Sequence, residues 1–141
     1  MTEAQKAYVA GIIDGEGCLT ARIEKSGYVN PRMTVAMCHK STIEHLVTIS
    51  ESGKARPASR SRQAHNSDRP MRTLWRWTLI GHDARRLLEK VRPYLHTKQR
   101  QADIFLEIMA HRGVSVLKQQ ELAAELKAAK LDGCTYIVEA A

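Results

Sequence analysis

The sequence lacks the features expected of a secreted, membrane-bound or disulfide-stabilised protein. Its cysteines, Cys18, Cys38 and Cys134, are odd in number and show no CxxC pair or other metal-site spacing. No apolar run reaches the roughly 20 residues that cross a bilayer, and we find no signal peptide. We therefore expect reduced thiols that act as small packing residues, a cytoplasmic location (bacterial, phage or organellar matrix) and no membrane partner.

Internal repeats are also absent, and acidic residues are scarce in one segment. The 141 residues suit one domain and carry a formal net charge of +7. Residues 54–76 hold seven of the basic groups and one acid, Asp68, whereas the segments on either side are nearly balanced. This concentration predicts a surface for a polyanion, with a solvated basic loop as the alternative. The basic residues are Lys54, Arg56, Arg60, Arg62, Arg69, Arg72 and Arg76.

Hydrophobic periodicity predicts an α+β fold of mixed αββαββα order. Capping boxes at Thr2 and Ser41 are expected to open two of its helices. The expected elements are a helix over 2–14, strands over 18–24 and 32–38, a helix from 41, strands over 54–62 and 72–80, and helices from 83, 97 and 115. We expect one antiparallel four-stranded sheet, backed by helices on its apolar face and open on its polar face.

Two further expectations concern packing. Trp75 and Trp77 alternate with polar residues and are expected to fill the buried side of the sheet. Residues 1–113 form the predicted domain, and residues 114–141 are expected to add a helical extension packed on it, with Leu117 among its inward-facing residues.

The most informative segment is Val9 to Gly17, V-A-G-I-I-D-G-E-G, which ends an apolar helix in two carboxylates placed between glycines. Small residues allow a second helix to pack closely, and glycines leave room for a ligand beside the main chain. The segment resembles the signature motif of the LAGLIDADG homing endonucleases, with Glu16 replacing the final Asp. Pro93 to Ala102 resembles a second family segment, Pro-aromatic-Leu-x-x-Lys-Gln-x-Gln-Ala. An ordinary helix end is the alternative interpretation of the first segment.

The resemblance implies a catalytic site. Glu16 corresponds to the family's metal-binding acid, and the carbonyl of Gly15 supplies a further oxygen ligand. Mg²⁺ is the expected ion, and Mn²⁺ or Ca²⁺ also suits such a site. Lys98 corresponds to a basic residue that stabilises the phosphate, and His39 to a polar residue that positions water. Asp14 is expected in a supporting role at the helix end. A solvated lysine and an ordinary surface histidine are the alternatives for Lys98 and His39.

The resemblance also implies two interfaces. Because the motif occurs once, we expect a homodimer joined through the first helix. The expected dimer residues are Tyr8, Ala10, Gly11, Ile12 and Gly15. The polar sheet face is expected to enter a DNA groove and read base edges. Its expected DNA-binding residues are Thr20, Arg22, Glu24, Arg32, Thr34, Cys38, Arg60, Arg62, Arg72, Arg76 and Thr78.

We therefore predict a homodimeric, Mg²⁺-dependent, site-specific double-strand DNA endonuclease that hydrolyses phosphodiesters at a long, near-palindromic site. Its gene would lie in an intron or intein, or stand free. One alternative is an inactive relative that binds intron RNA as a maturase or acts as a DNA-binding regulator. A basic structural protein is another alternative, but it leaves the glycine-flanked acids unexplained.

Overall fold

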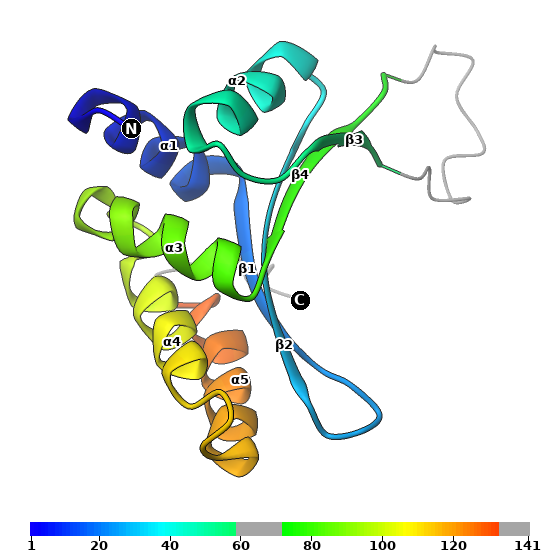
Figure 1. Ribbon diagram of the computed structural model, residues 1–141, viewed down its shortest axis with the longest axis vertical. Coiled ribbons are helices and arrows are strands. Elements are labelled where there is room, and N and C mark those ends of the chain that lie inside the picture. The colour runs from blue at the N-terminus through cyan, green and yellow to red at the C-terminus, as the bar shows by residue number, and fades with distance from the viewer. Residues whose placement is uncertain (59–71, 133–141) are drawn as a thin grey trace, which may run out of the picture.

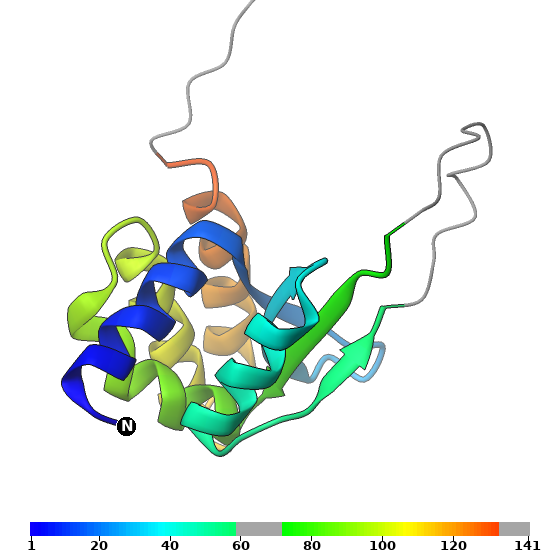
Figure 2. The ribbon, with the colours of Figure 1, turned by 90° about the horizontal axis from the view of Figure 1, so that it is seen from above.

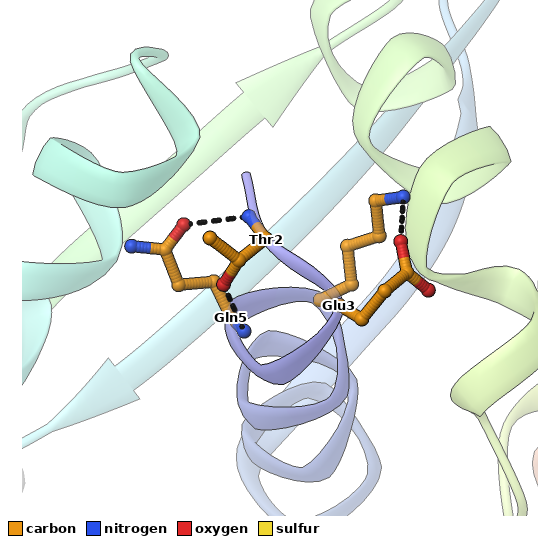
Figure 3. Close-up of polar contacts among 4 residues, drawn as sticks. Thr2, Glu3 and Gln5 are labelled. Atoms are coloured by element: carbon orange, nitrogen blue, oxygen red, sulfur yellow. Dashed lines mark hydrogen bonds and ion pairs between the residues drawn. The ribbon is translucent and has the colours of Figure 1, made fainter.

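The chain begins with helix α1 (Glu3–Glu16), whose first turn is fixed as predicted. The hydroxyl of Thr2 accepts the Gln5 N–H at 3.2 Å, and the Gln5 side chain accepts the Thr2 N–H at 2.9 Å (Figure 3). This is the capping box read from the sequence. The computed structural model describes residues 1–58 and 72–132.

Four strands form one antiparallel sheet in the order β1-β2-β4-β3, which places β1 and β3 at its edges. The strands are β1 (Gly17–Ile23), β2 (Val29–Met37), β3 (Ala55–Pro57) and β4 (Trp75–Ile80). Gly17 lets β1 follow α1 directly, because a Cβ there would lie 2.5 Å from the carbonyl oxygen of Ile13. The end of α1 is therefore fixed to the start of the sheet.

In the part of the chain that the structure describes, the helices lie on one side of this sheet and leave its other side bare (Figures 1 and 2). After α1 the helical elements are α2 (Lys40–Ser50), α3 (His82–Val91), the 3₁₀ turn η1 (Arg92–Tyr94), α4 (Gln99–Ala110) and α5 (Val116–Ala129). This arrangement confirms the predicted α+β class, with helices on the apolar face and a polar face left open.

The core lies between the sheet and the helices. Phe105, Leu19 and Trp77 are fully buried there. The indole N–H of Trp77 donates to the carbonyl of Ser52 at 2.8 Å. Gly53 permits this approach, because a Cβ there would lie 2.6 Å from the indole nitrogen. The prediction that Trp77 belongs to the core is confirmed.

Trp75 lies at the rim of the same core. It is partly buried and packs against the core. The ammonium of Lys40 sits 4.7 Å from the centre of its ring, a distance typical of a cation–π contact.

Several local expectations are wrong. Helix α2 begins one residue before Ser41, with His39 in the N-cap position, so Ser41 forms no capping box. Strand β2 begins at Val29, three residues before the start of the strand expected over 32–38. Strand β3 is three residues long, and the rest of the strand expected over 54–62 lies largely outside the described residues. Leu117 is 74% exposed rather than inward-facing, because the buried stripe of α5 follows other residues. That stripe is Gln119, Leu122, Ala123, Leu126 and Ala129.

The part of the extension that the structure describes packs on the rest of the chain, since α5 lies against α4 and β1. Within α5 the buried amide of Gln119 donates to the Ile108 carbonyl, near the end of α4, at 3.0 Å. The last carbonyls of a helix lack intrahelical partners, so this bond both satisfies α4 and attaches α5.

The cysteine expectation is wrong for two residues. Cys18 and Cys38 are exposed free thiols rather than packing residues, and Cys134 lies outside the described residues. Among the described residues, none of the helices has the length and apolar character needed to cross a membrane.

Candidate active site and nucleic-acid interface

The two motif carboxylates sit in different environments. The carboxylate of Asp14 accepts the backbone N–H groups of His96 at 2.8 Å and of Lys98 at 2.9 Å. It thereby ties the end of α1 to the segment between η1 and α4. Hydrogen bonds to a charged group of this kind stabilise by about 1.5–3 kcal/mol each. These contacts fit the supporting role predicted for Asp14.

Glu16 is exposed at the last position of α1, next to the exposed Gly15. Within residues 1–58 and 72–132, its side chain takes part in no hydrogen bond or ion pair. A Cβ on Gly15 would meet nothing within 4 Å, so the main chain here is open to an approaching group. Glu16 is therefore the motif acid that is free to act on a ligand.

Lys98 brings a basic group to this end of α1. Its ammonium donates to the carbonyl oxygen of Asp14, and its backbone N–H binds the carboxylate of the same residue. The lysine thus brings a partly buried positive charge to the residue that precedes Gly15.

The segment that carries Lys98 is itself braced. Arg92 in η1 donates to Asp103 in α4, with one nitrogen–oxygen distance of 3.0 Å. The hydrogen bond and the charge of Asp103 raise the pKa of Arg92 above its ordinary value. Because Arg92 precedes the Leu95–Lys98 segment and Asp103 follows it, this ion pair links the two elements that flank the segment.

His39 lies at the end of β2 and is exposed. Its Nδ1 is paired with the hydroxyl of Thr42 at 2.8 Å and with that of Ser41 at 3.2 Å. The other ring nitrogen, Nε2, takes part in no interaction within the described residues. The structure places His39 at the N-cap of α2, two residues after β2 ends, and its catalytic role stays a prediction.

The bare face of the sheet carries polar rows that run across the strands. One row joins Thr20, Arg32 and Ile80, and the next joins Cys18, Thr34 and Thr78. In the second row the Thr34 and Thr78 hydroxyls lie 3.3 Å apart. Their alternation with the buried row of Leu19, Met33 and Leu79 confirms the predicted strand faces.

Further rows add positive charge to this face. Arg56 pairs with Arg76 across β3 and β4, and Arg22 pairs with Asn30 across β1 and β2. An open groove of about 730 Å³ runs along the β3–β4 side. It is lined by Gly53, Lys54, Arg56, Pro57, Ala58, Arg76, Thr78 and Ile80. Cations and small polar groups of this kind suit a phosphate backbone and base edges.

Some predicted contacts lie elsewhere. Arg60 and Arg62 are outside the described residues. Arg72 precedes β4 and is exposed, and Glu24 follows β1 within 3.9 Å of Arg22. Cys38 is exposed just after β2.

Sequence reasoning missed three residues of the face. Asn30 precedes the strand expected over 32–38. In the structure it belongs to β2, and because it lies two residues before Arg32 it faces the same side of the sheet. Arg56 was counted only as part of the basic run. Ile80 was overlooked because an apolar residue was not expected among polar ones, yet it is 47% exposed.

One exposed side of α1 carries mostly small residues, with Tyr8 as the large exception. It includes Ala4, Ala7, Tyr8, Gly11 and Gly15. A Cβ added to Gly11 would meet nothing within 4 Å. Ala10, expected at a dimer contact, is instead fully buried, because it turns toward the core with Val9 and Ile13.

A single chain does not form a metal cage within its described residues, where no group of three His, Cys, Asp or Glu side chains is placed to hold an ion. The fit to a cation therefore rests on Glu16, an exposed hard oxygen donor, and on the open main chain at Gly15. Both fit Mg²⁺, which takes few protein carboxylates and keeps its other positions for water and phosphate oxygens.

No family model and no curated protein matches the sequence. Solved structures do resemble the fold. The homing endonuclease I-CvuI, in complex with the I-CreI target, aligns with a TM-score of 0.73 and 22% identity over 96% of this chain and 87% of that one. The archaeal intron-encoded homing endonuclease I-Vdi141I, complexed with DNA, aligns with a TM-score of 0.72 and 16% identity over 96% of this chain and 90% of that one. The LAGLIDADG meganuclease I-AabMI, bound to uncleaved DNA, aligns with a TM-score of 0.65 and 16% identity over 90% of this chain and 44% of that one. The chain thus has the fold of the LAGLIDADG homing endonucleases.

Proposed function

We propose that this chain is a homodimeric, metal-dependent, site-specific DNA endonuclease of the LAGLIDADG type. The observation that carries the proposal is the separation of the two motif acids at the end of α1. Asp14 is committed to backbone N–H groups, whereas Glu16 is exposed and unpaired within the described residues, at the start of a basic sheet face. A carboxylate in such a place repels phosphate unless a cation lies between them.

The bare sheet face supplies the DNA-binding surface in this proposal. Arg22, Arg32 and Arg76 project from three strands of one twisted sheet, and a ribbon of strands fits the major groove. I-CvuI and I-Vdi141I, whose fold the chain shares, were both solved with DNA.

The exposed side of α1 supplies the dimer contact. Gly11 and Gly15 leave the helix surface open to a second backbone, and small residues permit close helix packing. The two-fold axis would then bring the Glu16 side chains of both subunits to the middle of one DNA site. The match covers 44% of I-AabMI, so two copies of this chain would be close to the length of that protein.

Each residue of the site has a defined task. Glu16 and the Gly15 carbonyl would hold Mg²⁺ against a phosphate. When bound, such an ion would supply activation of the attacking water and charge stabilisation of the leaving 3′ oxygen. The ammonium of Lys98, fixed on the carbonyl of Asp14, offsets charge on the phosphate as it is attacked. His39 positions water beside the strands.

The test is to incubate the protein with a randomised, partly palindromic DNA library, with Mg²⁺ or with EDTA, and to sequence the ends. We expect discrete Mg²⁺-dependent ends at one enriched symmetric site. Glu16→Gln, which keeps the side-chain size, should bind that site and leave it uncut. Enrichment without cutting under any divalent ion would contradict the nuclease and favour the intron RNA maturase or regulator.

A further inference from the structure

The turn between β1 and β2 is held by a distant part of the chain. The side-chain amide of Gln120, in the first turns of α5, donates to the carbonyl oxygen of Gly27 at 2.8 Å, although the residues are 93 positions apart. The guanidinium of Arg112, at the corner between α4 and α5, lies 5.5 Å from the ring centre of Tyr28. The turn and the start of α5 share the lower end of the molecule in Figure 1.

The turn has few internal bonds of its own. Gly27 adopts a φ of +82°, which favours glycine. Two backbone bonds of 2.8 Å close the loop, from the N–H of Glu24 to the Tyr28 carbonyl and from the N–H of Gly27 to the Glu24 carbonyl. A two-stranded hairpin is at best marginally stable without outside packing. Beyond the rows that β4 pairs, the contacts of Gln120 and Arg112 therefore add outside support to the turn.

The same corner also touches the end of β4. A Cβ on Gly81, which follows Ile80, would lie 2.7 Å from a terminal nitrogen of Arg112. The N–H of Gly81 donates to the Pro31 carbonyl of β2 at 3.0 Å. Arg112 thus packs against both the turn and the strand end, and it fixes them relative to each other.

The turn lies at the far end of the sheet from Glu16. Strand β1 has seven residues, and at about 3.3 Å per residue it spans roughly 23 Å. DNA rises about 3.4 Å per base pair, so with β1 lying along the DNA and the cut beside Glu16, the turn would lie about seven base pairs from the cut. The row of Arg22 and Asn30 is the polar row next to the turn.

We infer that Gln120 and Arg112 are positioning residues that set base preference at the outer pairs of each half-site. They act through the turn, which holds Arg22 and Asn30 in place. Arginine suits guanine and asparagine suits adenine, in each case through two hydrogen bonds. Such paired bonds require distances within a few tenths of an ångström and good alignment, so a loosened turn weakens discrimination before it weakens binding. The inference rests on the proposed DNA-binding function.

The experiment compares base preference, pair by pair, for the wild type, Gln120→Ala and Arg112→Gln by library selection. Lys118→Ala is the control, because Lys118 is exposed on the same turn of α5 and pairs only with Glu121, at 3.5 Å, within the described residues. Amide hydrogen exchange of residues 25–28 is measured on the same proteins, together with the Tm.

In both variants we expect the base preference at about the seventh base pair from the cut to fall by threefold or more. The base preference at the inner pairs and the Tm should be nearly unchanged. Exchange in the turn should rise, and Lys118→Ala should match the wild type. Unchanged outer preference in the variants would overturn the inference and leave the nuclease intact. Preference lost equally at every pair would also overturn it, because that pattern indicates a general effect on folding. A wild type with no preference at any pair would refute the proposed function, and the inference with it.

Discussion

At the scale of single residues, the two motif acids have opposite relations to the rest of the chain. Asp14 binds two backbone N–H groups, and Glu16 is exposed and unpaired within the described residues. They stand only two residues apart in sequence, but this spacing rotates their side chains by about 200° around the helix, into different surroundings. Asp14 stabilises the site, and Glu16 is available for chemistry.

This difference predicts opposite effects on stability. Asp14→Asn should lower the free energy of unfolding by about 1–3 kcal/mol, since the amide keeps one acceptor oxygen and turns an NH2 donor toward the other N–H group. Glu16→Gln should change it by less than about 0.5 kcal/mol, as is usual for an exposed position. Urea unfolding of both variants measures the two values. Equal effects would contradict the division of roles.

Ile80 offers a second residue-scale test. Its exposed side chain lies in a polar row with Arg32, where an apolar group suits a thymine methyl. Burial of one methyl is worth about 0.8 kcal/mol, or about a fourfold change in affinity. Replacing that thymine by deoxyuridine in the selected site should weaken wild-type binding about fourfold.

The variant Ile80→Ser should bind both DNAs alike, because the methyl then has no apolar partner. Thr34, two residues from Arg32 on β2, provides a control variant, Thr34→Ala, that should keep the response to deoxyuridine at this pair. Equal affinities of the wild type for the thymine and deoxyuridine sites would place Ile80 away from the base edges.

At the scale of elements, the helices are joined by bonds between their ends. The segment after η1 holds the end of α1 through Asp14, and α5 holds the end of α4 through Gln119. Each bond satisfies a polar group that would otherwise be left without a partner, and each fixes an angle between two elements. The position of the site depends on these joints as much as on the core.

The joint at Gln119 should be costly to remove. Gln119→Met keeps the size of the side chain but leaves the Ile108 carbonyl without its donor. A buried unsatisfied group costs about 1–3 kcal/mol, so the urea midpoint should fall while the m-value stays unchanged. The exposed neighbour Lys118→Ala is the matched control. A midpoint equal to that of the control would show that water replaces the bond.

At the scale of the whole molecule, the fold separates its two surfaces. The helices of residues 1–58 and 72–132 cover one side of the sheet (Figure 2), so within these residues no helix lies between the opposite side and a partner. The exposed side of α1 meets this face at the start of β1. A contact through α1 therefore joins two open faces into one longer surface.

The dimer prediction follows from the same geometry. Gly11→Glu places a charge on the exposed side of α1, where a Cβ has open space, so the single chain should still fold. Its mass in sedimentation should fall from twice 15.9 kDa to 15.9 kDa, and cleavage should be lost with dimerisation. Ala110→Glu, on the exposed part of α4, is the control. A Gly11→Glu protein that remains dimeric would place the interface elsewhere.

The sequence by itself determined the order of elements, the strand faces and the motif. Period-two alternation assigned Leu19 and Met33 inward and Thr20 and Arg32 outward, because side-chain direction in a strand depends only on parity. The helices expected from 83 and 97, which are α3 and α4, followed from hydrophobic periodicity in the same way. The basic excess over 54–76 was equally visible, since charge needs no fold to be counted.

Only the tertiary structure decided which residues meet across the chain. The bonds from Asp14 to 96–98, from Gln119 to Ile108 and from Gln120 to Gly27 join positions 11 to 93 residues apart. No local pattern records such pairs, because a glutamine at a surface and one at a joint look alike in sequence. The N-cap of α2 was missed for a related reason, as His39 takes that place without a side-chain cap to signal it. Local periodicity fixes which way a side chain points, and packing of distant elements fixes what it touches.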